Sequence, residues 1–122
     1  MAKATKLVIK LTVGADEAEK VAQAFSVATT ALAAGVSVSL WLTGEASWFA
    51  IAGRAAGFSL PHSAPLDPML QALIAGGTVT LCTQCAVRRN INEGDQIDGI
   101  RIAGAATFVE EIMNDETQAL VY

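Results

Sequence analysis

Residues 78–89 read Thr78-Val79-Thr80-Leu81-Cys82-Thr83-Gln84-Cys85-Ala86-Val87-Arg88-Arg89. Residues 78–81 form a short apolar run that is typical of a buried strand, and residues 83–89 favour a helix. The only two cysteines of the chain therefore lie where the strand ends and the helix begins. The unpaired N–H groups and the partial positive charge of a helix start both favour the thiolate, which is the reactive form of cysteine. We thus expect Cys82 and Cys85 to be the catalytic residues.

Strand and helix patterns alternate from one end of the chain to the other. Strand patterns occupy residues 6–12, 36–42, 78–81, 100–102 and 118–122, and helix patterns occupy residues 18–32, 47–56, 68–75, 83–89 and 105–112. Asp16 and Glu19 have capping-box spacing before the first helix, Gly35 is placed to end it, and Pro68 suits the first position of the third helix. This alternation predicts one α/β domain over residues 1–122, with three α/β/α layers and a mostly parallel five-stranded sheet.

Sites in parallel sheets form beyond the carboxyl ends of the strands. The loops after the first three strands meet at that edge, and they contain Gly14, then Gly44 with Glu45, then the cysteine pair. We therefore expect Gly14, Gly44 and Glu45 to line a pocket at the thiols, although Glu45 could instead cap the helix that follows it. Gly14 is isolated, and no phosphate-binding glycine motif follows any strand, so no cofactor is expected.

Composition narrows the classes of partner. The net charge is −4 and the few Lys and Arg residues are scattered, which argues against a nucleic-acid partner. Charged residues make up only 16% of the chain, against about 25% in a typical domain, so we expect part of the surface to be buried in a homo-oligomer. No signal peptide is visible and no apolar run reaches the ~18 residues of a membrane span. The expected location is the cytoplasm, where a cysteine pair is catalytic or metal-binding more often than structural.

The run from Leu81 to Ile91 resembles the cysteine segment of the DsrE/DsrF/DsrH-like family, which includes the TusD-type sulfur-relay proteins. In that family a strand-end cysteine is followed, after five residues, by Arg-Arg-Gly and an aliphatic residue. In this register Cys82 falls on the sulfur-accepting cysteine, Arg88 and Arg89 fall on the paired arginines, and Asn90 replaces the glycine. The resemblance implies a DsrEFH-like fold, a persulfide carried on Cys82, sulfur donor and acceptor proteins, and a homotrimer or homohexamer.

Cys85 departs from this pattern, because the relay proteins lack a thiol at this place. An adjacent thiol can attack a persulfide and release sulfide. Two alternatives to a sulfur-transfer protein therefore stay open: a thiol-disulfide redox protein that uses the Cys82/Cys85 pair, and a non-catalytic oligomeric subunit. Whether the chain is an enzyme, as a sulfurtransferase, or only a sulfur carrier also stays open.

Three further residues have two interpretations each. Arg88 and Arg89 either neutralise the helix end and pair with Glu93 or Asp95, or steer an anionic substrate or donor toward the thiols. His62, the only histidine, is either solvated in its proline-flanked loop or a proton donor near the thiols.

A single Cys-x-x-Cys supplies two of the four ligands that a tetrahedral zinc site needs, so no metal is expected.

Overall fold

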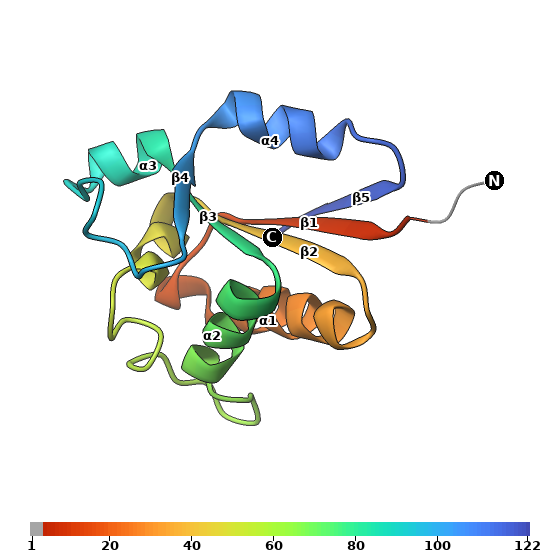
Figure 1. Cartoon of the computed structure of the whole chain (residues 1–122). Coiled ribbons are helices and arrows are strands. Elements are labelled where there is room, and N and C mark those ends of the chain that lie inside the picture. Colours follow the sequence, from red (N-terminus) through yellow and green to blue (C-terminus); the bar gives the residue numbers. More distant parts are fainter. Residues whose placement is uncertain (1–3) are drawn as a thin grey trace.

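The structure is a computed structural model that describes residues 4–122. Residues 1–3, on which the expectation of no signal peptide partly depends, lie outside the described residues. The central element is a five-stranded sheet (Figure 1). Its strands are β1 Lys6–Leu11, β2 Ser37–Leu42, β3 Thr78–Cys82, β4 Arg101–Ala103 and β5 Thr117–Val121. They are ordered β4-β3-β2-β1-β5, and every neighbouring pair is parallel.

Helices cover both faces of the sheet, as Figure 1 shows. One face carries α1, Ala18–Ala33, and α2, Leu66–Gly76, and the other face carries α4, Ala105–Ile112. The short helix α3, Thr83–Arg88, continues directly from β3, and two 3₁₀ segments, Ala15–Glu17 and Gly44–Ala50, follow β1 and β2. The predicted three-layer α/β/α fold is therefore confirmed, and the sheet is parallel throughout.

The two faces of the sheet differ in chemistry because side chains alternate along each strand. The α1 and α2 side is a continuous apolar core that includes Ile9, Leu40 and Leu81. The α4 side presents polar and bulky side chains at the intervening positions, among them Lys10, Ser39, Trp41, Thr80 and Cys82. A single eight-residue helix covers this second face.

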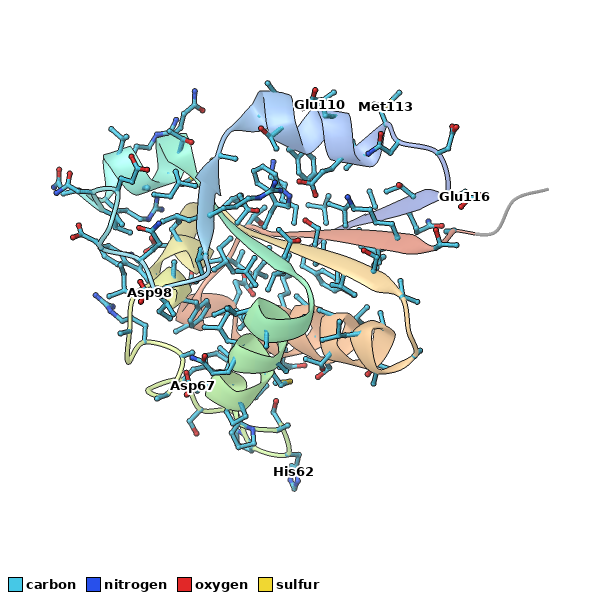
Figure 2. All side chains as sticks on the ribbon, viewed as in Figure 1. His62, Asp67, Asp98, Glu110, Met113 and Glu116 are labelled. Carbon is cyan, nitrogen blue, oxygen red and sulfur yellow. The ribbon has the colours of Figure 1, made fainter. Side chains whose placement is uncertain are left out.

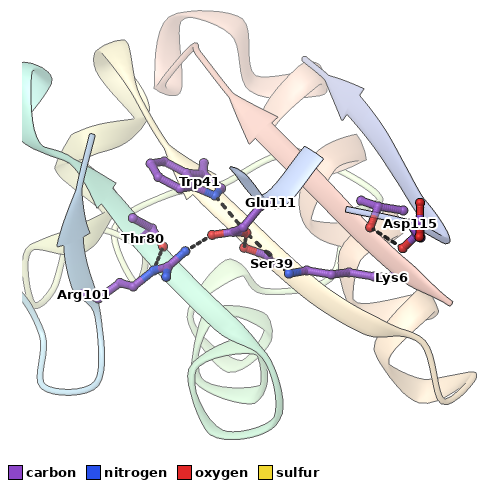
Figure 3. A network of polar contacts seen from close by, with 8 residues as sticks. Lys6, Ser39, Trp41, Thr80, Arg101, Glu111 and Asp115 are labelled. Atoms are coloured by element: carbon purple, nitrogen blue, oxygen red, sulfur yellow. Dashed lines mark hydrogen bonds and ion pairs between the residues drawn. The ribbon is translucent and has the colours of Figure 1, made fainter. Parts of the chain in front are cut away.

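A buried carboxylate holds α4 on the sheet (Figure 3). Glu111 accepts a hydrogen bond from the Ser39 hydroxyl at 2.6 Å and from the Trp41 ring N–H at 3.4 Å. The Arg101 guanidinium pairs with its second oxygen, and the Lys6 ammonium lies 3.9 Å from the first. Burial opposes ionisation, but the Ser39 and Arg101 hydrogen bonds and the Arg101 charge outweigh it, so the pKa of Glu111 is lowered.

Several local predictions were wrong. Asp16 caps no helix: its carboxylate accepts the Gly14 N–H at 3.3 Å within a tight turn, and α1 begins later without a side-chain cap. Residues 47–56 do not form an α-helix, because the chain continues as a 3₁₀ segment to Ala50 and then as turns through Gly53, where φ is +88°. α2 begins before Pro68, which occupies the first turn, where a missing N–H costs no helical hydrogen bond.

Other local predictions were right. Gly35 lies just beyond the end of α1 with φ +87°, the left-handed conformation expected of a helix-terminating glycine. No helix among residues 4–122 is both long enough and apolar enough to cross a membrane.

Candidate functional site

Both cysteines lie at the carboxyl edge of the sheet. Cys82 is the last residue of β3 and Cys85 lies in the first turn of α3, so the strand-to-helix junction predicted from the sequence positions both thiols. Neither is in a disulfide; Cys82 is partly exposed and Cys85 is buried. Both line one cavity of about 450 Å³ beneath α4.

The sulfur of Cys85 is surrounded by donors and positive charge. The backbone N–H of Gly44 donates to it at 3.2 Å, and a guanidinium nitrogen of Arg88 approaches to 4.0 Å. Burial raises the pKa of Cys85, but the Gly44 hydrogen bond, the neighbouring Cys82 side chain and the charges of Arg89 and Arg88 outweigh burial and lower it overall. The surroundings of Cys85 therefore favour its thiolate form.

Gly44 can donate this hydrogen bond because it has no side chain. Its φ is +53°, in the left-handed region, and a Cβ there would collide with the Thr12 carbonyl oxygen of the neighbouring loop. Gly14 supports the same junction, since a Cβ on it would come within 3.0 Å of Glu45. Gly44 lines the thiol cavity, whereas Gly14 and Glu45 line a separate hollow beside it.

Arg89 connects the cysteine helix to the loop after β2. Its guanidinium forms an ion pair with Glu45 at 2.9 Å and donates to the Cys85 carbonyl oxygen at 3.1 Å. The expected pairing of Arg88 or Arg89 with Glu93 or Asp95 was wrong within residues 4–122, because the loop after β2 comes closer to α3 than the acidic loop does. Glu45 therefore neutralises Arg89 and does not cap the 3₁₀ segment, which begins at Gly44 without a side-chain cap.

Asn90 turns the chain sharply at the end of α3. Its φ is +56°, so it adopts the left-handed conformation that Asn tolerates better than most residues do. The N–H of the next residue, Ile91, returns to the Ala86 carbonyl oxygen at 2.9 Å. Asn90 thus makes a turn in a backbone conformation that glycine adopts most readily.

Three residues of the cavity were not anticipated as site residues from the sequence. Lys10 extends from β1, Trp41 from β2 and Phe108 from α4, and all three line the cavity with the cysteines. The Trp41 and Phe108 rings meet edge to face at 5.3 Å, and the Lys10 ammonium lies 5.2 Å from the Phe108 ring centre. The available signal was Lys10 itself, which is a charge inside an otherwise apolar strand.

His62 lies away from the thiols. It is exposed on the loop before α2, at the far side of the molecule in Figure 2, with φ +62°. It borders a hollow formed with α1 and Tyr122, which does not include either cysteine. The structure therefore does not bring His62 to the site. Within residues 4–122 no cluster of three or more His, Cys, Asp or Glu side chains is placed to bind a metal ion.

Comparison with known proteins agrees with the fold. The family model described as the DsrE/DsrF-like family matches residues 5–120. The crystal structure of the ychN protein from E. coli has the same fold, with a TM-score of 0.71 and 19% sequence identity over 97% of this chain and 99% of that one. No curated protein sequence matches the chain.

Proposed function

Because the chain belongs to the DsrE/DsrF-like family, we propose that it is a sulfur-transfer protein that carries a sulfane sulfur as a persulfide on Cys82. The observation that supports this most directly is the arrangement of two thiols in one cavity, with Cys82 partly exposed and with the pKa of the buried Cys85 lowered. Cys82 offers the accessible sulfur, and Cys85 supplies the negative charge beside it.

In the proposed reaction Cys85, whose pKa is lowered, accepts the proton of Cys82. When the Cys82 sulfur attacks the outer sulfur of a donor persulfide, its proton passes to the Cys85 thiolate. A sulfur–sulfur bond forms on Cys82, the donor's sulfur–sulfur bond breaks, and the donor leaves as a thiolate. The net charge and the number of protons are unchanged, so no oxidant or reductant is needed. Gly44, Arg88 and Arg89 favour the starting state by stabilising the Cys85 thiolate.

The family also supports the wider setting that we propose for this reaction. Sulfur arrives from a donor protein and leaves to an acceptor protein, and the chain works in the reducing cytoplasm as a homo-oligomer. The exposed apolar side chains of α4, Val109 and Met113, support the last of these points.

A second function is favoured by the presence of both thiols in one cavity. Two free cysteines in this position, one with a lowered pKa, can form a disulfide when an oxidant is present. In this thiol-disulfide function both cysteines are indispensable, whereas sulfur carriage needs only the accepting one.

Intact mass after incubation with a protein-bound persulfide, under non-reducing conditions, tests the proposal. We expect a gain of one sulfur atom, located on Cys82 by peptide mapping, and no gain in Cys82→Ser. Cys85→Ser is the matched control; it should still gain sulfur, but roughly tenfold more slowly, because the neighbouring thiolate that accepts the proton is gone.

The other outcomes discriminate the alternatives. A gain of sulfur that persists in Cys82→Ser would refute carriage on Cys82. A loss of two hydrogens, with the two cysteines linked, would support the thiol-disulfide function. An unchanged mass in the folded protein would identify a non-catalytic subunit.

A further inference from the structure

The cavity at the thiols has a charged side chain that the proposed function does not use. Among the residues that line it, Lys10 is the one that carries a formal charge on its side chain, apart from the thiols, and the lining includes no Asp or Glu. Within residues 4–122 no carboxylate lies within 4.0 Å of the Lys10 ammonium, although Lys6 and Arg101 on the same face both pair with Glu111. Lys10 is therefore a cation that faces the cavity without an acidic partner.

The other residues of the cavity strengthen the attraction between Lys10 and an anion. Trp41 and Phe108 are apolar, and they reduce the water available to screen the Lys10 charge. The hydroxyls of Thr12 and Thr43 donate to the backbone carbonyl oxygens of Tyr122 and Leu11, so they are already occupied. An anion that enters the cavity thus finds its principal charge partner in Lys10.

The spacing suits a small molecule. Lys10 lies on β1 and Cys82 on β3, with β2 between them. Lys10 is in register with Trp41 and Thr80, so Cys82 lies two residues further along β3 and the two backbones are about 12 Å apart. Both side chains line the same cavity of about 450 Å³, which has room for an anionic group with an adjoining sulfur atom.

We infer that this cavity binds a small sulfane-sulfur compound that carries an anionic group, with Lys10 holding the anionic group and Cys82 accepting the sulfur. The inference rests on the proposed function and adds the class of substrate. Thiosulfate and a carboxylate-bearing persulfide such as glutathione persulfide share this chemistry.

The reaction with thiosulfate balances without a further reactant. The Cys82 sulfur attacks the outer sulfur of thiosulfate and its proton passes to the Cys85 thiolate. The sulfur–sulfur bond of thiosulfate breaks, and sulfite leaves with the bonding electron pair. The products are a Cys82 persulfide anion, a protonated Cys85 and sulfite, which carry the same total charge as the reactants. Lys10 stabilises the charge that grows on the leaving sulfite.

The test compares rates of sulfur gain for the full chain with thiosulfate, glutathione persulfide and a protein-bound persulfide. We expect Lys10→Gln to slow the reaction with one or both small donors roughly fivefold, the loss expected of one partly solvated charge contact, and to leave the protein-bound donor unaffected. Lys10→Arg should restore most of the rate, and added salt should reduce the difference. Lys20→Gln is the matched control, since Lys20 is exposed on α1, on the other face of the sheet.

A neutral probe separates anion binding from damage to the site. Alkylation of the cysteines by iodoacetamide should proceed equally in Lys10→Gln and in the parent protein. The inference would be overturned if Lys10→Gln and the parent protein gained sulfur at equal rates from both small donors. It would also be overturned if only the protein-bound donor added sulfur. In either case the proposed function would stand. Failure of every donor to add sulfur would instead refute the proposed function itself.

Discussion

At the scale of single residues, the reactivity of the thiol pair depends on the backbone of a residue far away in the sequence. Gly44 precedes Cys85 by 41 positions, yet its N–H is a direct partner of the Cys85 sulfur. The strand-to-helix junction alone would have favoured ionisation of both cysteines. The N–H of Gly44 and the charges of Arg89 and Arg88 lower the pKa of Cys85.

Gly44→Ala tests this contact. The added Cβ would collide with the Thr12 carbonyl oxygen and would strain a left-handed residue, so the loop must shift and the N–H must move from the Cys85 sulfur. We expect a stability loss of about 1–3 kcal/mol and a shift to higher pH of the midpoint for thiol alkylation. Gly35→Ala is the control, since Gly35 also has a positive φ but has open space around it and lies at the opposite end of β2. An unmoved alkylation midpoint in a folded Gly44→Ala protein would contradict the role of this hydrogen bond.

At the scale of elements, α4 covers the thiol cavity, and its position on the sheet depends on one buried carboxylate. Ala105, Phe108 and Val109 of α4 line the cavity, while Glu111 anchors the same helix to β2 and β4. Apolar contact alone does not hold a helix on a polar sheet face. The ion pairs and hydrogen bonds of Glu111 add the stabilisation that the small apolar contact area lacks.

Glu111→Gln tests the anchor. The neutral amide leaves Arg101 without its charge partner, so we expect a stability loss of about 2 kcal/mol in denaturant unfolding at neutral pH. Glu110→Gln is the matched control, because Glu110 is the exposed neighbour on the same helix. A loss of equal size in both variants would mean that Glu111 is not the anchor.

Glu111→Gln should also change how the stability of the protein depends on pH. The pKa of Glu111 is lower in the folded protein than in the unfolded chain, so its contribution is fully present above the unfolded pKa and is lost as the pH falls through the folded pKa. The parent protein should therefore lose stability on acidification more steeply than Glu111→Gln does. Parallel slopes of stability against pH would contradict the assignment.

At the scale of the whole molecule, the second face of the sheet is thinly covered. One short helix lies over it, and the outer surface of that helix leaves Val109 and Met113 more than half exposed. Low overall charge and an apolar outer helix together favour association between copies of the chain. In the proposed homo-oligomer α4 would then form the interface between copies, close to the thiol cavity.

Met113→Glu tests this assembly. A carboxylate in a desolvated interface is costly, so we expect the sedimentation coefficient to fall toward that of the monomer. Thr30→Glu is the control, since it adds the same charge to the exposed surface of α1 on the opposite layer. A parent protein that sediments as a monomer, or a Met113→Glu variant that stays assembled, would remove α4 as the interface.

Features that depend on neighbouring residues were predictable from the sequence alone. The alternation of patterns predicted the layered parallel fold, the strand-to-helix junction predicted the cysteine placement, and Gly35 was correctly assigned to the end of α1. Local patterns report such features because hydrophobic periodicity and backbone conformation act over one or two turns. The same local rules were wrong for the Asp16 cap and for the helix at residues 47–56, where contacts between loops outweigh helix propensity.

The groups that surround the thiols could not be predicted in this way, because they come from elements that are far apart in the sequence. The Gly44 N–H, the Arg89–Glu45 pair and the Lys10 ammonium all reach the site or its edge from other elements, and His62 is carried away from it. The strand order β4-β3-β2-β1-β5 brings β1 and β3 to opposite sides of β2, although 66 residues lie between them. Electrostatic and hydrogen-bonding effects depend on distance in space, and that distance is set by the packing of the whole sheet.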